Sequence, residues 1–432
     1  MEEPETKTIL IDTTCLFDQY SKRGIGRYTR DLLLRLIKKA SADRSIKISL
    51  VGFNDLEQNL REIGFSKFGI EEYQDKITFT SLGEPSLSNF KNIRRWKKID
   101  EIIFEEEPDL YFAPHFERGL PTTPSLKHTY MPNKTVVTVH DVIPLVNNSF
   151  SQKNPITNFL KGIFYRRMWK GVEGADLVLT SSNFSKDDLI KHGDIPEDNV
   201  EVIYLGINES FFAEKIDSIE ETTKNEVLNR FVGEGRPSYF FYDSGLESNK
   251  GIDNMLSITA RLFEKKGEHI PQYLVLVGGD FYQGRGENIK PRSALGEHYL
   301  KKIKQLGIID KVITTSRISD EELQILLRHA NTYVYFSEYE GFGFGPIQAM
   351  AAEVPAIVNA SSCLPEITNG GAFLVDAKEI EDSINKIYDF LKDEQKRKEL
   401  VNTGKEVALK YNWERTADLV LENFHKLLTE TE

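Results

Sequence analysis

The chain has 432 residues, and its 55 basic and 67 acidic residues give a formal net charge of −12. A chain of this length predicts two domains rather than one, and hydrophobic residues, at 40%, suffice for two packed cores. An acidic chain without a basic block argues against nucleic-acid binding, which depends on neutralising phosphates.

The cysteines and the start of the chain predict a reducing compartment. Cys15 and Cys363 lie far apart in the sequence, which favours two small buried residues over a disulfide. The opening residues MEEPETKTILIDTT are acidic and lack the apolar run of a secretion signal. No segment approaches the roughly 18 apolar residues of a membrane-spanning helix. We therefore expect a cytoplasmic protein, which can still touch the inner face of a membrane.

Short apolar runs that predict buried strands alternate with helical patterns along the first half. The predicted strands are residues 8–12, 46–52, 135–140, 177–181 and 200–204. A helix is expected over residues 26–39, where Leu32, Leu33, Leu36 and Ile37 share one face. This alternation is typical of a parallel sheet covered by helices.

A second series of strands follows at residues 239–244, 273–278, 312–315, 332–336, 356–359 and 372–375, with a helix over 321–329. The polar residues 208–237 separate the two series, so the predicted domains are 1–212 and 213–411. Residues 412–432 have helical spacing and are expected to pack back towards the first domain. The polar, glycine-containing stretch 281–297 predicts a surface loop.

These elements predict an α/β fold with two Rossmann-like, doubly wound domains facing across a cleft. Ligands of such domains bind outside the carboxyl ends of the strands, so the cleft is the expected site.

The segment SEYEGFGFGPIQAMAA (337–352) is the most informative for function. A strand ends before it, Gly341, Gly343 and Gly345 allow close approach of a ligand to the backbone, and Pro346 favours the start of a helix. The free N–H groups at such a helix start suit a diphosphate. A plain strand-to-helix turn fits the same spacing, and the spacing alone does not separate the two.

The segment EGFGFGPIQAMAAEVPAI resembles the donor-site signature of the retaining glycosyltransferases of family 4 (glycosyl transferases group 1), which have the GT-B fold. That signature has two glutamates with seven residues between them. The resemblance implies that Glu340 binds hydroxyls of the donor sugar and that position 348 binds the ribose. Here position 348 is Gln348, whose carbonyl oxygen still accepts a hydrogen bond but without the charge. Weaker or altered nucleotide binding is expected.

Two segments of the first half are similar to other parts of that family. RGIGRYTRDLLLRL (23–36) is similar to its glycine loop and first helix, which implies that Gly24 and Gly26 approach the donor phosphates. TVHDVIPL (138–145) is similar to its His-Asp turn. By that likeness His140 contacts the sugar or its phosphate and Asp141 anchors the turn. A purely structural role for His140 stays open.

The second half continues the resemblance. YDSGLESNKGIDNML (242–256) looks like the phosphate-binding strand, loop and helix. Gly245 stands where many members have an arginine, so Lys250 would neutralise the diphosphate, with a solvated surface lysine as the alternative. The match over 315–341 implies that the backbone of Ile318 bonds the base. Glu366 is expected to begin a helix rather than to catalyse.

The expected site thus has two parts. The residues expected to catalyse are Glu340, His140 and Lys250. The residues expected to bind the donor are Gly24, Gly26, Gly245, Lys250, Gly278, Ile318, Gly341, Phe342, Gly343 and Gln348.

Two basic, aromatic stretches lie at residues 90–103 and 159–170. Basic amphipathic helices can lie on anionic lipid, giving peripheral membrane contact. An ordinary packed helix with a solvated face explains them equally.

The resemblance implies a retaining, metal-independent hexosyltransferase with no cofactor beyond its nucleotide-sugar donor. GDP-mannose is the favoured donor and a UDP-sugar the next. The acceptor would be a glycan or a lipid-linked glycan in polysaccharide or glycoconjugate synthesis. The alternative is a non-catalytic GT-B partner subunit that binds glycan or a companion transferase, motivated by Gln348 and Gly245. A nucleotide-sugar epimerase or a glycan phosphorylase on the same architecture is a third reading.

Overall fold

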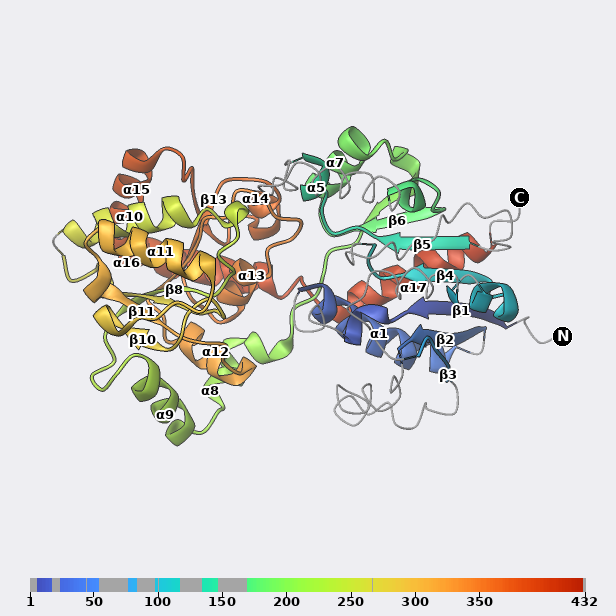
Figure 1. The fold of residues 1–432 in the computed structure, drawn as a ribbon, viewed down its shortest axis with the longest axis horizontal. Helices are drawn as coiled ribbons and strands as arrows, with labels where there is room; N and C mark the ends of the chain where they lie inside the picture. Colours follow the sequence, from blue (N-terminus) through green and yellow to red (C-terminus); the bar gives the residue numbers. More distant parts are fainter. Residues whose placement is uncertain are drawn as a thin grey trace. The chain divides into compact units, whose positions relative to one another are not determined.

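The structure is a computed structural model, and it describes residues 6–17, 24–43, 45–53, 77–83, 98–99, 101–116, 134–146, 169–265 and 267–429. The chain divides into two compact units. The first comprises Met1–Gly206 and Asn412–Glu432, and the second comprises Ile207–Tyr411 (Figure 1). Most of the two basic, aromatic stretches at 90–103 and 159–170 lies outside the described residues.

The first unit contains a seven-stranded sheet in the order β3-β2-β1-β4-β5-β6-β7. Every neighbouring pair is parallel. The strands are β1 (Lys7–Asp12), β2 (Ile46–Gly52), β3 (Ile77–Ser81), β4 (Leu110–Ala113), β5 (Lys134–Thr138), β6 (Leu177–Thr180) and β7 (Val200–Val202). Strands β3 and β4 were missing from the sequence prediction. β3 is a half-exposed edge strand and gives no clear apolar run, whereas β4 is a short, fully buried apolar run that the prediction overlooked.

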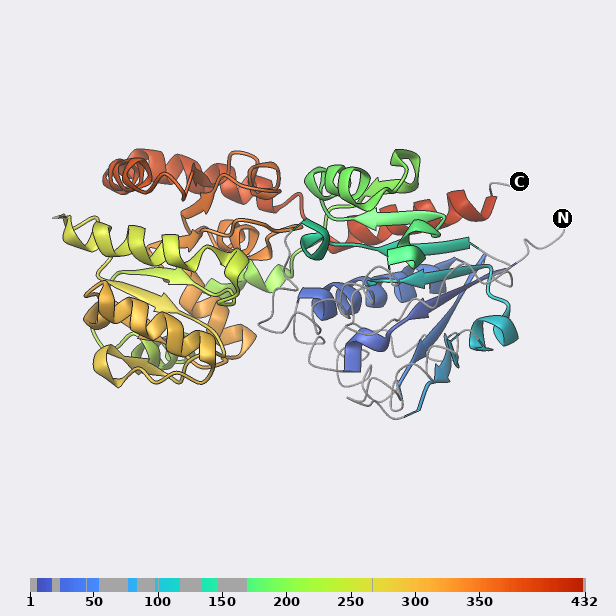
Figure 2. The ribbon, with the colours of Figure 1, turned by 45° about the horizontal axis from the view of Figure 1, so that its top comes forward.

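Helices α1 (Gly24–Ala42) and α17 (Trp413–Thr429) pack together in the first unit although they stand at opposite ends of the chain (Figure 2). Lys39 of α1 forms ion pairs with Glu414 and Asp418 of α17. The ring of Phe424 packs edge-on against Phe112 of β4. The last helix is therefore part of the first unit. The unit also contains η1 (Thr14–Phe17), α5 (Ile143–Val146), α7 (Asn183–Gly193) and η4 (Glu197–Asn199).

The second unit contains a seven-stranded sheet in the order β10-β11-β9-β8-β12-β13-β14. Its strands are β8 (Tyr239–Tyr242), β9 (Tyr273–Leu276), β10 (Gly284–Arg285), β11 (Val312–Thr314), β12 (Thr332–Tyr335), β13 (Ala356–Asn359) and β14 (Phe373–Val375). All pairs are parallel except β10, which runs antiparallel to β11. The prediction of a plain surface loop over 281–297 was therefore wrong. Part of that stretch extends the sheet, and its last residues begin a helix.

The second unit also has many helical segments. They are η5 (Glu209–Phe211), α8 (Ala213–Asp217), α9 (Glu221–Phe231), η6 (Ser248–Lys250), α10 (Ile252–Glu264), η7 (Gly286–Asn288), α11 (Ala294–Gln305), η8 (Ile309–Lys311), α12 (Asp320–Arg328), α13 (Phe344–Ala351), α14 (Leu364–Thr368), α15 (Ile380–Lys392) and α16 (Glu394–Ala408). Both units thus have the predicted α/β architecture. Within the described ranges, no helix is both long and apolar enough to cross a bilayer.

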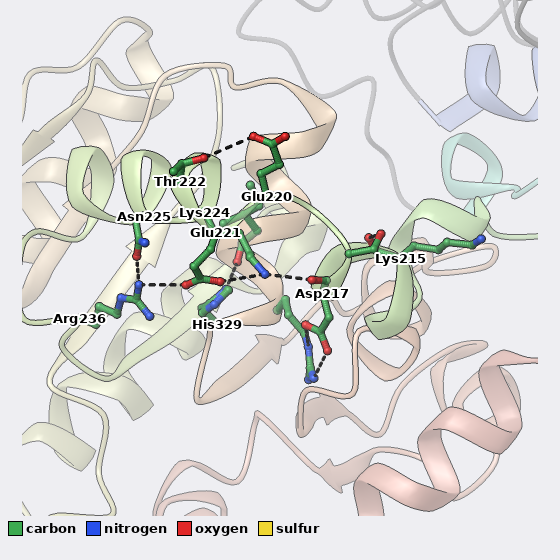
Figure 3. A network of polar contacts seen from close by, with 12 residues as sticks. Lys215, Asp217, Glu220, Glu221, Thr222, Lys224, Asn225, Arg236 and His329 are labelled. Atoms are coloured by element: carbon green, nitrogen blue, oxygen red, sulfur yellow. Dashed lines mark hydrogen bonds and ion pairs between the residues drawn. The ribbon is translucent and has the colours of Figure 1, made fainter.

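The polar residues 208–237 are ordered parts of the second unit rather than a linker. Lys224 of α9 is buried, and its Nζ donates to the backbone oxygen of Asp217 at 3.0 Å and pairs with Glu221. The Asp217 carboxylate accepts two hydrogen bonds from Arg328 of α12. Figure 3 shows this network joining α8 and α9 to the end of α12. The boundary between the two units lies after Gly206, earlier than the 212 expected from composition.

Gly206 lies against the start of α17 in the first unit. A Cβ atom at this position would lie 2.3 Å from the backbone nitrogen of Trp413 and 2.6 Å from its Cα. We expect Gly206→Ala to lower the free energy of unfolding by about 2 kcal/mol or more, because backbone cannot move aside as a side chain can. The measurement is urea unfolding of the parent and the variant.

Gly83→Ala is the matched control in the same unit, since nothing lies within 4 Å of an added Cβ there. Its positive φ of 85° should cost only about 1 kcal/mol. A smaller loss for Gly206→Ala than for Gly83→Ala would contradict the tight packing of Trp413.

Candidate active site

The centre of the second sheet provides the natural place for a ligand. The strand order reverses between β8 and β12, which are neighbours in the sheet although β9, β10 and β11 lie between them in the sequence. Ligands of open α/β sheets bind outside the carboxyl ends of the strands at such a reversal. The loop after β8 carries Gly245 and Lys250, and the loop after β12 carries Glu340 and the glycines that follow it.

A close backbone contact brings these two loops together. Gly251 follows Lys250 with φ at +62°, and a Cβ atom there would lie 1.9 Å from the backbone oxygen of Phe336. Only glycine fits both the left-handed conformation and the contact. The loop after β8 therefore lies directly against the end of β12.

Lys250 and Glu340 form an ion pair at this point. The Lys250 Nζ lies 2.6 Å from Oε1 of Glu340, and the two side chains are only 18% and 13% exposed. The Tyr335 hydroxyl donates to the same Oε1 at 2.7 Å. The interpretation of Lys250 as a solvated surface lysine was therefore wrong, and the structure brings two of the three predicted catalytic residues into contact.

Hydrogen bonds from both neighbouring loops fix the backbone around Glu340. The Asn249 side-chain amide donates to the Tyr339 oxygen at 3.1 Å, and the Asn249 oxygen accepts from the Glu338 amide at 2.8 Å. The Glu340 amide donates to the Ser362 hydroxyl at 3.1 Å, in the loop after β13. Glu340 thus has a defined position before any ligand binds.

Helix α13 begins beside Glu340 and leaves its first amides available. Its N-cap is Gly343, with φ at +87°, and no side chain caps it. The helix begins at Phe344, so the prediction that Pro346 opens it was off by two positions. A proline in the first turn costs nothing there, since its missing N–H would have no helical partner. An uncapped helix start favours an anion.

Gln348 of α13 is buried, at 6% exposure, yet its side-chain amide forms no hydrogen bond with the described part of the chain. Its amide atoms are not among the buried side-chain atoms that lack a partner, so they reach open space and can bond a ligand. The backbone of Ile318 is also available to a ligand. Neither its N–H nor its C=O group forms a hydrogen bond among the described residues.

The remaining predicted residues of this unit lie in the same loops. Gly278 follows β9, and only the Ser244 oxygen, at 3.8 Å, would touch a Cβ atom there. At Gly245 an added Cβ would meet only the flexible Glu247 carboxylate. Gly341 precedes Phe342, which is buried and packs edge-on against Phe344 and Tyr411. Phe342 is thus a packing residue of this loop.

Gly24 and Gly26 lie in the first unit, in the first turn of α1. The expectation of a glycine loop at these positions was wrong for the two glycines themselves, because the helix already includes them. Gly24 is exposed and Gly26 is buried. Gly24 is the first residue of the helix, where the backbone N–H groups have no partner within the helix.

His140 follows β5 in the first unit. Both ring nitrogens are buried and have no hydrogen-bond partner among the described residues, although the residue keeps some exposed surface. Its ring packs edge-on against Tyr28, with centroids 4.5 Å apart. Burial lowers the pKa of His140 to about 4, so the imidazole is neutral at pH 7. A structural hydrogen-bonding role for this side chain finds no support in the described residues.

Several minor expectations are confirmed. The Ile143 amide donates to Asp141 Oδ1 at 3.0 Å, so Asp141 anchors its turn. Glu366 lies in the first turn of α14. Cys15 and Cys363 are both buried, and neither forms a disulfide.

The residues that the sequence did not indicate are Tyr335, Asn249 and Ser362. Tyr335 stands in a buried strand, where an aromatic residue usually indicates core packing. The available signal was its hydroxyl, since a buried tyrosine generally needs a hydrogen-bond partner.

The neutral His140 predicts a pH dependence of stability. Its pKa is about 4 when folded and about 6.5 when unfolded. The stabilisation is therefore complete above pH 6.5 and is lost as the pH falls towards 4, by up to about 3 kcal/mol. We expect His140→Asn to lose less of its melting temperature than the parent between pH 7 and pH 4.5. Equal losses in the two proteins would contradict the buried, neutral imidazole.

Comparisons with known proteins agree with this architecture. Residues 23–211 match the family model described as Glycosyltransferase Family 4, and residues 211–407 match the one described as Glycosyl transferases group 1. The chain is 25% identical over 431 residues to the serotype-specific mannosyltransferase WbdA of Escherichia coli, covering 97% of this chain and 48% of that protein. It thus spans about half the length of that relative.

Two further proteins are similar over almost their whole length. The O-antigen chain mannosyltransferase B of Escherichia coli is 22% identical over 415 residues, covering 95% of this chain and 97% of that protein. The crystal structure of HepE from Anabaena in complex with UDP-glucose superposes with a TM-score of 0.67 at 18% identity, covering 97% of this chain and all of the other. The two family matches and the shared fold lead to one conclusion: the chain belongs to the group 1 glycosyltransferases and has the GT-B fold.

Proposed function

We propose that this enzyme transfers a hexose, mannose first among the candidates, from a nucleotide-sugar to a glycan or lipid-linked acceptor in polysaccharide synthesis. The observation that carries the proposal is the Lys250–Glu340 ion pair beside the uncapped start of α13. A cation and a helix start suit a diphosphate, and a carboxylate suits sugar hydroxyls. Mannose is favoured because the relatives WbdA and mannosyltransferase B carry that activity in their names.

In the proposed reaction, Lys250 exchanges Glu340 for the donor diphosphate. Lys250 and the first amides of α13 then stabilise the negative charge that develops on the leaving diphosphate. The side-chain carbonyl oxygen of Gln348 accepts hydrogen bonds from the ribose hydroxyls. The backbone of Ile318 forms hydrogen bonds with the base. The glycines Gly278, Gly341 and Gly343 leave room for the donor, and the cation in this scheme is Lys250 rather than a metal ion.

Glu340 binds hydroxyls of the donor sugar and orients it. The acceptor hydroxyl attacks the anomeric carbon from the side of the leaving group while the bond to the diphosphate oxygen breaks. A diphosphate oxygen takes the acceptor proton. Configuration is retained because the attack and the departure occur on the same face of the sugar. In the first unit, the neutral imidazole of His140 has both ring nitrogens available to bond a hydroxyl or a phosphate oxygen of a ligand.

A panel of GDP-, UDP- and ADP-sugars tests this proposal by thermal shift and by release of the free nucleoside diphosphate, with and without EDTA. We expect one base to raise the melting temperature and its sugar to release diphosphate slowly, unaffected by EDTA. Absence of stabilisation by every donor would overturn the proposed donor site.

Glu340→Ala should lower turnover by about 100- to 1,000-fold and keep the affinity for the free nucleoside diphosphate. The reason is that the variant loses the contact with the sugar while Lys250 remains for the diphosphate. Kinetics of donor cleavage and calorimetric titration with the diphosphate measure the two effects. Glu338→Ala is the control, because that exposed residue uses its backbone in the loop. Parental turnover in Glu340→Ala would remove Glu340 from the mechanism.

Gln348→Glu should tighten nucleotide binding by several-fold to about tenfold, since a carboxylate accepts a stronger hydrogen bond from a ribose hydroxyl. Gln324→Glu is the control, because Gln324 is equally buried but bonds the Ser210 hydroxyl. Calorimetric titration with the nucleoside diphosphate chosen by the panel gives both affinities. An unchanged affinity in Gln348→Glu would place the ribose elsewhere.

A further inference from the structure

The two carboxylate oxygens of Glu340 have unequal surroundings. Oε1 receives both the Lys250 ammonium at 2.6 Å and the Tyr335 hydroxyl at 2.7 Å. Among the described residues, no side chain or amide donates to Oε2. Oε1 therefore accepts two hydrogen bonds, and Oε2 can accept hydrogen bonds from a ligand.

The two groups that hold Oε1 differ in mobility. Lys250 ends a flexible four-carbon stem and would turn to a diphosphate under the proposed function. Tyr335 lies within β12 and is only 4% exposed. A tyrosine ring with two side-chain torsions, packed in a sheet, offers its hydroxyl at one fixed point.

The packing around Tyr335 explains why it cannot move aside. Its ring stacks on Tyr333, with centroids 6.0 Å apart and an interplanar angle of 18°. The Tyr333 hydroxyl in turn donates to Asp243 at 2.7 Å. Gly345 makes room for that hydroxyl, because a Cβ atom there would lie 2.0 Å from it. Two stacked tyrosines thus present their hydroxyls to two carboxylates at the end of one strand.

The Tyr335 hydroxyl remains a donor at neutral pH. Burial, and next the negative charge of Glu340, raise the pKa of Tyr335 far above its ordinary value. The phenol therefore keeps its proton and donates it to Oε1. A phenylalanine would fill the same space without that donor.

We propose that Tyr335 is a positioning residue, which keeps Glu340 oriented when Lys250 leaves it for the donor diphosphate and so presents the free Oε2 to a hydroxyl of the donor sugar. This inference rests on the proposed function. It adds a residue whose effect passes entirely through Glu340. Tyr335 itself need not touch the donor.

The test compares Tyr335→Phe with the control Tyr239→Phe, each in the parent and in a Glu340→Gln background. Tyr239 lies in the same sheet, is equally buried, and donates its hydroxyl to the Leu326 backbone oxygen at 2.7 Å. The probes are GDP-mannose and UDP-glucose for diphosphate release, and GDP and UDP for binding. Melting temperatures show whether each variant is folded.

We expect Tyr335→Phe to lower kcat/KM for the accepted donor about ten- to a hundredfold, as for loss of a hydrogen bond to a charged group. The Kd for the free diphosphate should stay within about twofold, since no contact to the phosphates or base is removed. In the Glu340→Gln background the same change should cost less than about threefold, because the two residues act as one unit. Tyr239→Phe should change kcat/KM little in either background.

Two results overturn the inference. The first is an unchanged kcat/KM in Tyr335→Phe. The second is an equal fold loss of kcat/KM when Tyr335→Phe is made in the parent and in the Glu340→Gln background, because an equal loss indicates a general structural effect. If the parent releases diphosphate from neither probe nor from the wider donor panel, the proposed function fails, and this inference fails with it. Parental activity thus separates the two failures.

Discussion

The ion pair between Lys250 and Glu340 is the contact on which the rest of the second unit's site depends. It exists because Gly251 lets the loop after β8 lie directly on the backbone of Phe336, closer than any side chain allows. The loops after β8, β12 and β13 then share hydrogen bonds through Asn249 and Ser362. A partly buried pair of this kind is held tightly only while both partners remain, since removing one leaves an uncompensated charge. A ligand that binds Lys250 must therefore also leave Glu340 with a new partner, and sugar hydroxyls can provide one.

The chain has a formal net charge of −12, whereas the Lys250–Glu340 pair of this site is neutral as a whole. An acidic protein repels a nucleoside diphosphate at long range, so recognition must come from local groups. The uncapped start of α13 and the Lys250 ammonium supply positive charge where β8 and β12 end. Because the pair is largely withdrawn from solvent, salt screens it less than it screens the surface.

The sequence predicted most of the strands that are buried on both faces, and β4, with four buried residues, is the exception. β2 and β13 had the predicted bounds, and most other strands differed by a residue or two, because their apolar runs end at polar or glycine residues. β3 and β10 escaped prediction because edge strands need only one paired side and carry mixed residues. The boundary after Gly206 escaped for another reason. The polar residues that suggest a linker are here held by a buried lysine, and composition does not reveal such a contact.

The candidate site was predictable where chemistry determines the residue type. Glu340, Lys250 and Gln348 were predicted from the resemblance to the family's donor-site signature, since the glycine spacing alone also fits a plain strand-to-helix turn. The contact between Lys250 and Glu340 was not predictable, because ninety residues of chain separate them and only the sheet order makes them neighbours. Tyr335 was not predicted because it lies in a buried strand, where an aromatic ring usually indicates core packing. Its ring does pack in the core, but its hydroxyl donates to Glu340.

The return of α17 to the first unit has a consequence for biosynthesis. The second unit is one continuous segment, whereas the first needs α17 beside α1 and Phe424 against Phe112. During vectorial synthesis the second unit can reach its final fold as soon as Tyr411 has left the ribosome. Most of the first unit is translated earlier, but its fold is complete only when α17 has been synthesised. Until then the face of α1 that packs against α17 is uncovered. The order of completion is thus the reverse of the order of translation, and the open face of α1 is the surface that chaperones have to protect meanwhile.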